Sequence, residues 1–287
     1  MISPLSIVWD VSPVMFSIGN FEVRYYGLTW AMAIGFGLWL FIRFCRNEGL
    51  KEELADSAFW YVALGTIIGA RLGHCLFYDF DYYLCNPVEI LNLRQGGMAS
   101  HGAAIGMMVG LWLFARNQRM PYLWGLDRVV IASAIGGSFV RFGNLLNSEI
   151  YGEPTDLPWG FIFVQNGETV PMHPTQIYEA LCYILTFAVL MVMYCRYDQG
   201  RRHPGMLFGA GIVGIFLSRF IIEYIKNPQK SFELDMDLMM GQWLSIPFVV
   251  LGIVMICLSY TSRFRGYVPD MALHAAPKVV KKNQKKH

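Results

Sequence analysis

Charged residues are scarce in this chain. Only 15% of its 287 residues are Asp, Glu, Lys or Arg, while 55% are hydrophobic, whereas a soluble domain usually carries about 25% charged residues. Together with long apolar runs, this scarcity excludes an ordinary soluble domain and indicates that a lipid bilayer is the main solvent. The formal net charge is only +2, and the uneven placement of the basic residues indicates membrane topology rather than nucleic-acid binding.

Several functional patterns are also missing. The six cysteines are scattered without CxxC spacing, so we expect no disulfide framework, metal site or cofactor. There is no Gly-x-Ser-x-Gly and no His-Glu-x-x-His, which argues against a membrane protease. No repeat is evident, which argues against many transporter folds. The N-terminus up to Asn20 lacks a basic segment and a cleavage site, so a removable signal peptide is not expected.

What the chain does contain is a series of apolar stretches, each long enough to cross a bilayer as a helix. The pattern predicts an all-α membrane protein with a bundle of about seven transmembrane helices in one catalytic domain, residues 1–262. The expected spans are Tyr25–Phe44, Ser57–Tyr78, Ser100–Ala115, Leu123–Phe142, Ile177–Cys195, Met206–Tyr224 and Met239–Leu258. The third is the shortest and could be partly interfacial. A basic tail, residues 263–287, is expected to be cytoplasmic and disordered.

Basic residues alternate between the loops. The first and third loops carry Arg46, Lys51, Arg116 and Arg119, whereas the long fourth loop, from residue 143 to 176, has no Lys or Arg. The fifth loop and the tail are basic as well, and the sixth loop is a mild exception because it contains Lys226 and Lys230. The positive-inside rule therefore places the N-terminus outside and the C-terminus in the cytoplasm.

Polar groups inside the expected spans gather at one side of the membrane. Ionisable groups in a bilayer are costly, so each is a functional candidate. With the orientation above, the spans bring polar residues toward the outer face. They include Tyr26, Arg71, His74, His101, Arg141, Asn144, Asn147, Glu149, Glu179, Arg219, Glu223 and Gln242. A non-catalytic scaffold offers no reason to bury two of these arginines.

Two arginines of this set suit an anionic substrate. Arg141 and Asn144 are spaced i,i+3 and can face one cavity, and Arg219 and Glu223 are spaced i,i+4 on one helix face. Either Arg219 and Glu223 form an ion pair within the helix, or Arg219 stays free to hold an anion. A guanidinium can make two charge-assisted bonds to phosphate oxygens. A phosphate at the outer interface would most naturally belong to a phospholipid.

His101 is the candidate general base. Histidine is the usual base near neutral pH, and glycines on both sides of His101 allow close approach of another backbone. The alternative is a structural histidine that caps the start of a helix. His173, which lies in the loop before the fifth span, is expected to be structural.

At these positions the sequence resembles a known family. Residues 141–152 read RFGNLLNSEIYG and continue through Thr155 to Pro158-Trp159-Gly160. Supporting matches are Tyr26-Gly27, Gly69-Ala70-Arg71, Gly96-Gly97-Met98, Ser100-His101-Gly102, His173-Pro174-Thr175-Gln176, Tyr178-Glu179, Arg219 with Glu223, and Gly241-Gln242 with Ser245 and Pro247. This pattern is similar to that of the prolipoprotein diacylglyceryl transferases, over nearly the whole chain except the tail.

Three positions depart from the family pattern. Val140 stands where the family often has glycine, and Ala103 replaces a second glycine after the histidine. Ile215 stands four residues before Arg219, where a tyrosine is expected, which puts a phenol contact in the site in doubt.

The resemblance implies a specific reaction in the bacterial cytoplasmic (inner) membrane, with the active site toward the periplasmic face. Such enzymes move the diacylglyceryl group of phosphatidylglycerol to the lipobox cysteine at the end of a prolipoprotein signal peptide. The products are a thioether-linked lipid and glycerol phosphate, in the first step of lipoprotein maturation.

The residue inventory suits this chemistry. We expect His101, Arg141 and Arg219 to be catalytic, with His101 as the base and the arginines stabilising the leaving phosphate. We also expect six residues to bind phosphatidylglycerol or the acceptor. They are Arg141, Asn144, Glu149, Tyr26, Gly152 and Glu223. Alternatively, the arginine field alone activates the thiol and His101 is structural.

Overall fold

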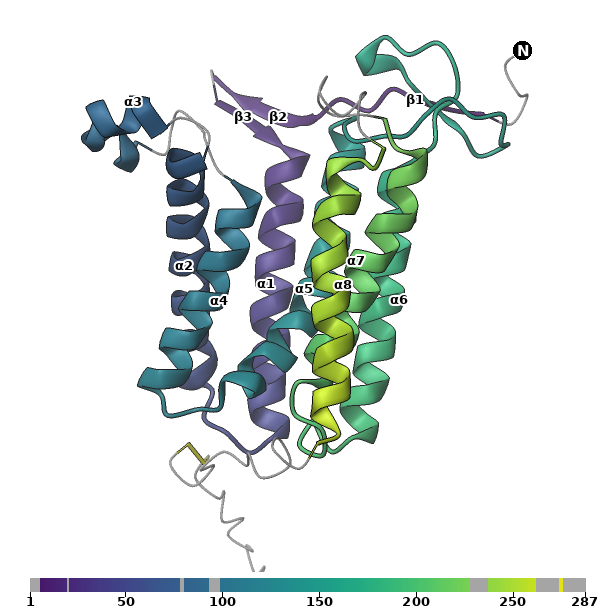
Figure 1. Ribbon diagram of the computed structural model, residues 1–287. Helices are drawn as coiled ribbons and strands as arrows, with labels where there is room; N and C mark the ends of the chain where they lie inside the picture. Colours follow the sequence, from purple (N-terminus) through teal and green to yellow (C-terminus); the bar gives the residue numbers. More distant parts are fainter. Residues whose placement is uncertain are drawn as a thin grey trace, which may run out of the picture. The chain divides into compact units, whose positions relative to one another are not determined.

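The fold comes from a computed structural model of the full chain. It describes residues 6–19, 21–77, 80–92, 99–227, 237–261 and 274–275, and all structural statements below concern these residues. Most of the described chain is helical, as the apolar stretches predict (Figure 1).

Long helices coincide with the expected spans. They are α1 (Tyr25–Asn47), α2 (Glu53–Phe77), α4 (Ser100–Asn117), α5 (Tyr122–Leu146), α6 (Thr175–Arg196), α7 (Met206–Ile222) and α8 (Met240–Ser259). In the described part of the chain, 6 helices are long and apolar enough to cross a membrane. The helix that does not reach this limit is α4, the stretch expected to be the shortest. An all-α membrane protein is therefore confirmed.

The chain divides into two compact units. The first consists of Met1–Leu40 and Leu126–Tyr267, and the second of Phe41–Gly125 and Val268–His287. Because α1 and α5 each cross the division, a unit is a group of packed segments and not a stretch of continuous chain.

Close packing of α2 against α4 organises the second unit, and Figure 1 shows the two helices side by side. Glycines spaced four residues apart face each other on the two helices. They are Gly65, Gly69 and Gly73 on α2, and Gly102, Gly106 and Gly110 on α4. A Cβ added at Gly69 would lie 2.6 Å from Gly106 Cα, and one added at Gly73 would lie 2.8 Å from Gly102 Cα. Since lipid tails are as apolar as leucine, such backbone approach is a main source of helix association in a bilayer.

Arg71, one of the polar candidates, has a structural position in the second unit. Its guanidinium donates hydrogen bonds to the backbone oxygens of Glu89, Ile90 and Asn92 at 2.6, 2.8 and 2.9 Å. These oxygens belong to the short helix η1 (Pro87–Leu91) and the residue after it, which follow α3 (Phe80–Cys85). Arg71 therefore fastens this segment to the end of α2.

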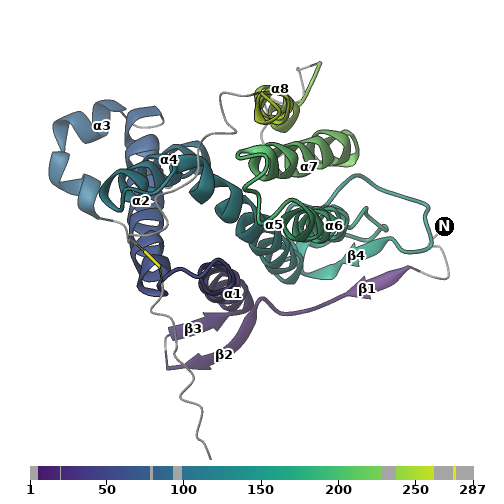
Figure 2. The same cartoon turned by 90° about the horizontal axis from the view of Figure 1, so that it is seen from below.

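In the first unit, α6 packs against α7 and α7 against α8 (Figure 2). Asp127 of α5 is 1% exposed and accepts hydrogen bonds from the backbone N–H groups of Gly205 and Phe208 at 2.9 and 2.8 Å. These N–H groups lie at the start of α7 and have no partner within their own helix. The carboxylate therefore caps α7 and ties it to α5.

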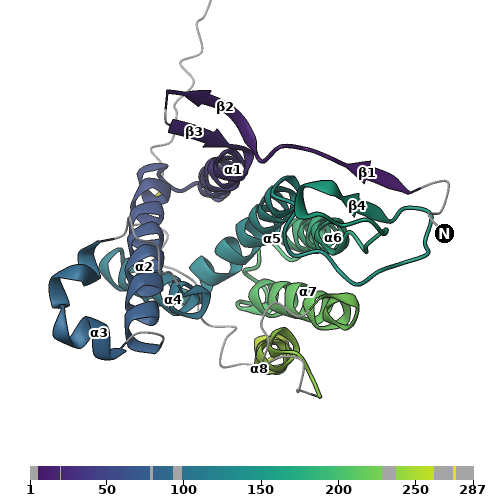
Figure 3. The same cartoon turned by 90° about the horizontal axis from the view of Figure 1, so that it is seen from above.

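Short strands, which the apolar pattern did not predict, extend the first unit. β2 (Val14–Ile18) and β3 (Phe21–Arg24) form an antiparallel hairpin that leads directly into α1 (Figure 3). β1 (Ile7–Trp9) pairs in parallel with β4 (Phe161–Phe163) of the fourth loop. The N-terminal segment and the fourth loop therefore lie on the same side of this unit, as the predicted topology requires.

Part of the expected tail is described. His274 and Ala275 contact the first loop, because Lys51 N–H donates to His274 O at 2.9 Å and Leu50 forms a bridge with Ala275. His274 Nε2 also lies 2.6 Å from the backbone oxygen of Gln118, in the third loop. The other residues of 263–287 lie outside the described part, so their disorder stays a prediction.

Candidate active site

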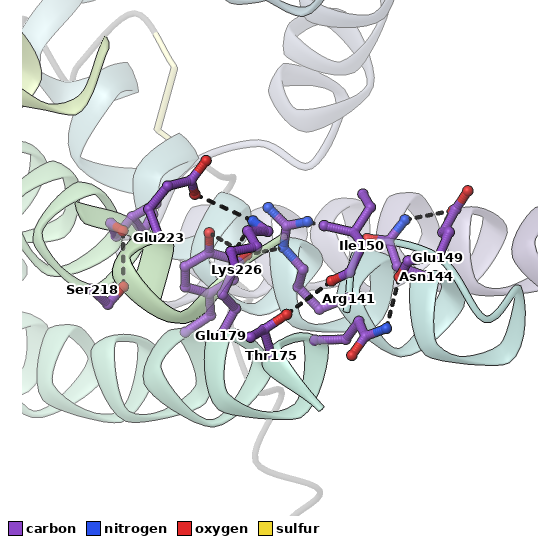
Figure 4. Close-up of polar contacts among 12 residues, drawn as sticks. Arg141, Asn144, Glu149, Ile150, Thr175, Glu179, Ser218, Glu223 and Lys226 are labelled. Atoms are coloured by element: carbon purple, nitrogen blue, oxygen red, sulfur yellow. Dashed lines mark hydrogen bonds and ion pairs between the residues drawn. The ribbon is translucent and has the colours of Figure 1, made fainter. Parts of the chain in front are cut away.

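Arg141 lies in the last two turns of α5, and the structure joins it to two of the other candidates. Its Nη1 donates to Asn144 Oδ1 at 3.3 Å, and Asn144 Nδ2 donates to Glu149 Oε1 at 2.7 Å. Asn144 is 3% exposed. Asn144 therefore links Arg141 to Glu149, and binding of substrate by these residues stays a prediction (Figure 4).

The turn after α5 is held in an uncommon backbone conformation. Ser148 and Ile150 have φ angles of 53° and 62°, a region that non-glycine residues adopt rarely and β-branched residues almost never. The first turn of α6 stabilises it: Thr175 Oγ1 donates to Ile150 O at 2.8 Å, and Gln176 Nε2 donates to Glu149 O at 2.7 Å. Strain of this kind often occurs at functional sites.

Glu179 is the centre of a buried ion network. One carboxylate oxygen pairs with Arg141 Nε, and the other pairs with Lys226 Nζ at 2.7 Å. Lys226 Nζ also lies 3.3 Å from a carboxylate oxygen of Glu223. The side chains of Glu179 and Lys226 are only 1% and 2% exposed. Figure 4 shows Arg141, Glu179 and Lys226 converging from three different segments of the chain.

Arg219 and Glu223 do not form the ion pair that their spacing allows. α7 ends at Ile222, and Glu223 begins the short helix η4 (Glu223–Ile225). The carboxylate of Glu223 pairs with Lys226 instead. Among the described residues, the half-buried Arg219 makes no hydrogen bond or ion pair, although it attracts Glu179 electrostatically. Of the two alternatives, the structure therefore favours a free Arg219.

Gly152 allows the segment that carries Lys226 to approach the fourth loop. Gly152 and Lys226 form an antiparallel bridge, and Glu153 N–H donates to Ile225 O at 3.0 Å. A Cβ at Gly152 would collide with Ile225 O and would lie 2.7 Å from Thr175 Cγ2. These contacts, and the hydrogen bond from its N–H to His173 O, give Gly152 a packing role, and its predicted substrate binding stays a prediction.

A phenol does enter the network, although Ile215 replaces the expected tyrosine of α7. Tyr183 of α6 is 5% exposed, and its hydroxyl donates to Glu179 Oε2 at 3.5 Å. The same hydroxyl interacts with the Arg141 guanidinium. At the other end of the network, Gly241 of α8 packs directly on the Glu223 carboxylate, where a Cβ would lie 2.8 Å from Oε2.

Tyr26 lies in the first turn of α1 and packs against α5. A Cβ at Gly143, two residues after Arg141, would lie 2.9 Å from the Tyr26 ring and would collide with Thr29 Oγ1. The ring of Tyr26 also meets Trp30 edge-on, with centroids 6.4 Å apart. Tyr26 is thereby placed beside the helical turn that carries Arg141.

His101 begins α4 in the second unit, and its side chain lies outside the described part of the structure. The prediction that His101 is the general base therefore stays a prediction.

His173, predicted to be structural, belongs to a hydrogen-bonded group at the start of α6. Trp159 Nε1 donates to the Tyr178 hydroxyl at 2.9 Å, and that hydroxyl lies 3.3 Å from His173 Nδ1. Burial lowers the pKa of His173 below its usual value, although the nearby Glu153 carboxylate partly offsets this. A neutral imidazole can accept a hydrogen bond from the Tyr178 hydroxyl, so this arrangement suits an uncharged structural histidine.

Two central residues were not chosen from the sequence as site residues. Glu179 was noted for its depth and as part of the family match Tyr178-Glu179, and Lys226 only as an exception to the loop charge pattern. That exception could have marked Lys226 as a candidate. A lysine on the expected outer side of a membrane protein often pairs with a buried carboxylate or with an external anion. The sequence could not show that both lysine and arginine reach one carboxylate.

The fold and this site define a multi-pass membrane protein with a buried, cation-rich network at one end of its helices. Comparison with known proteins gives the family. The sequence profile described as "Prolipoprotein diacylglyceryl transferase" matches residues 13–258, and the chain belongs to this family of membrane transferases.

Named relatives agree over most of the chain. A phosphatidylglycerol–prolipoprotein diacylglyceryl transferase of Porphyromonas gingivalis is 46% identical over 270 residues, which cover 89% of this chain and 95% of the relative. Proteins with the same name from Chloroherpeton thalassium and Tolumonas auensis are 41% and 40% identical. Their alignments cover 87% and 90% of this chain, and 93% and 100% of the relatives.

Proposed function

We propose that this transferase moves the diacylglyceryl group of phosphatidylglycerol to the lipobox cysteine of prolipoproteins, in the bacterial inner membrane with its site toward the periplasmic face. The names of the relatives supply the two substrates. The observation that supports the chemistry is the buried network around Glu179, which holds Arg141 in place while Arg219 remains unpaired among the described residues.

The reaction is a displacement at the carbon of the diacylglyceryl group that is bonded to the phosphate oxygen. The cysteine sulfur forms a bond to this carbon, the carbon–oxygen bond breaks, and glycerol phosphate leaves with the electron pair. The thiol proton goes to a base, because the thiolate is the nucleophile and a free cysteine has a pKa of about 8.5. No electron donor or acceptor is needed.

The charge on the phosphate group increases as it leaves, from one negative charge toward two. Arg141 and Arg219 would stabilise that increase electrostatically, since preorganised cations act most strongly where charge develops. Asn144 and Glu149 orient Arg141 or bind glycerol hydroxyls, and Tyr26 positions the lipid or acceptor. His101 is the proposed base; the alternative is that the arginine field alone activates the thiol.

A transfer assay tests this proposal. Purified protein in liposomes receives phosphatidylglycerol with labelled acyl chains and a lipobox peptide, and label on the peptide cysteine is measured. We expect transfer by the wild type and its loss in Arg141→Ala. Arg24→Ala is the matched control, because Arg24 lies on the exposed β3 strand and pairs only with Glu22 in the described structure.

The outcomes separate the roles. A folded wild type without transfer contradicts the proposed function, and full activity of Arg141→Ala contradicts the role of that arginine. Loss of activity in His101→Ala that returns at high pH, where the thiol ionises by itself, supports His101 as the base. Full activity of His101→Ala assigns thiol activation to the arginine field.

A further inference from the structure

Five ionisable side chains meet where α5, α6 and α7 end or begin, and their charges do not balance. The cations are Arg141, Arg219 and Lys226, and the anions are Glu179 and Glu223. Within this group, three cations against two carboxylates leave one surplus positive charge. Glu149, the other carboxylate near Arg141, accepts a hydrogen bond from Asn144 Nδ2 and forms no ion pair in the described part of the chain. Buried charges are normally paired, so the surplus marks a position for an anion.

The surplus falls on Arg219. Both carboxylate oxygens of Glu179 form ion pairs, one with Arg141 and the other with Lys226 at 2.7 Å. Glu223 is taken by the same lysine, at 3.3 Å. Arg219 has neither a hydrogen bond nor an ion pair within the described part of the chain, although Glu223 is only four residues away.

Lys226 holds the carboxylate that Arg219 could otherwise pair with. At i,i+4 on one helix, a glutamate and an arginine ordinarily attract each other. Lys226 competes for the same carboxylate, and its backbone is held by the bridge to Gly152, where a side chain would collide with Ile225 O. Gly241 also packs on the Glu223 carboxylate.

We propose that Lys226 is a positioning residue: it engages Glu179 and Glu223 so that Arg219 stays available for the phosphate of the lipid substrate. This inference rests on the proposed function. Lys226 itself need not touch the substrate, because its side chain is 2% exposed and its ammonium pairs with two carboxylates. It sets the charge of the site at one surplus cation.

Paired substitutions test this role. In Lys226→Met, Glu223 loses its partner and takes Arg219, so kcat/KM for phosphatidylglycerol should fall about tenfold or more as a charge-assisted phosphate contact is lost. The KM for the lipobox peptide should not change. Lys226→Met combined with Glu223→Gln removes one charge of each sign, restores the surplus cation, and should raise kcat/KM above that of Lys226→Met. Lys226→Arg should retain activity.

A lysine that merely supports the fold gives a different result. In that case the double variant is no more active than Lys226→Met, because both contacts are missing, and this outcome overturns the proposal. Wild type that transfers no lipid at all contradicts the proposed function instead, so the two failures are distinguishable.

A measurement on the unaltered protein covers the case in which the variants do not fold. Phenylglyoxal, which modifies unpaired guanidinium groups, is added to wild type in liposomes, and the modified arginines are identified by mass spectrometry. We expect Arg219 to react before Arg141, and phosphatidylglycerol to protect Arg219 more than phosphatidylcholine or inorganic phosphate does. Faster modification of Arg141 overturns the proposal.

Discussion

Buried charge is tolerated beside Arg141 because each carboxylate has a cation within ion-pair distance. Glu179 and Lys226 are each 1% exposed, and Glu223 is 5% exposed. Removing one member of such a network leaves an unpaired buried charge, which typically costs about 3–5 kcal/mol. At the scale of single residues, the site therefore depends on charge balance as much as on the groups that face the substrate.

Glycine has an equally local role where Tyr26 meets α5. The expected effect of Gly143→Ala is a loss of transfer activity of about tenfold or more, because displacement of a positioning group by about 1 Å can cost far more than that. The new Cβ would lie 2.9 Å from the Tyr26 ring, only two residues from Arg141. The transfer assay measures the effect.

Gly136→Ala is the matched control for Gly143→Ala. Gly136 also lies on α5 and faces α1, but a Cβ there would lie 3.8 Å from Ala33 Cβ, which is an ordinary contact. Gly136→Ala should keep wild-type activity. If the two variants were equally active, Tyr26 would not need its present position.

At the scale of elements, helix pairs in both units approach through glycine. α2 and α4 meet along six glycines, and in the other unit a Cβ at Gly209 of α7 would lie 2.6 Å from Gly252 O of α8. Because the chain has 28 glycines, the composition alone does not identify these positions as helix contacts. Their i,i+4 spacing acquires its meaning from the opposite helix, since small residues on both sides let backbones touch.

Gly69→Ala should lower the thermal stability of the protein in detergent. The added methyl group would lie 2.6 Å from Gly106 Cα, so α2 and α4 must separate. Overpacking of this kind usually costs about 1–3 kcal/mol. Thermal unfolding followed by tryptophan fluorescence measures the change.

Gly35→Ala on α1 supplies the comparison, because a Cβ there meets nothing within 4 Å. Alanine is a better helix former than glycine, so the melting temperature of Gly35→Ala should equal or exceed that of wild type. Equal stability of the two variants would show that the α2–α4 contact is looser than described.

At the scale of the whole molecule, the distribution of basic residues predicts the membrane orientation. Arg46 and Lys51 belong to the first loop, and this loop contacts His274 and Ala275 of the tail. His274 also contacts Gln118 of the third loop. The fourth loop, which has no Lys or Arg, instead contains β4, and β4 pairs with the N-terminal strand β1. The placement of these ends inside or outside the cell stays a prediction of the positive-inside rule.

Reporter fusions test this orientation in bacterial cells. Alkaline phosphatase, which is active only outside the cytoplasm, should be active when inserted at the exposed turn at Gly167 and inactive when inserted after Gln118. Green fluorescent protein fused to the C-terminus should fluoresce. The opposite pattern would reverse the orientation and place the Arg141 network on the cytoplasmic side.

The sequence by itself determined the membrane class, the positions of the long helices and the family. Helix ends agree within a few residues because a bilayer requires about 20 apolar residues per span, and this requirement is local to each stretch. Arg141, Asn144 and Glu149 could also be grouped in advance, because they lie within nine residues of one another.

Only the tertiary structure decided how the charges pair. Glu179 and Lys226 are 47 positions apart, and their ion pair depends on α6 packing beside the end of α7. The i,i+4 spacing of Arg219 and Glu223 allowed two outcomes, and the end of α7 at Ile222 with the lysine three residues beyond Glu223 selected one. Short-range spacing states which groups can meet, whereas the choice among competing partners depends on distances that packing sets.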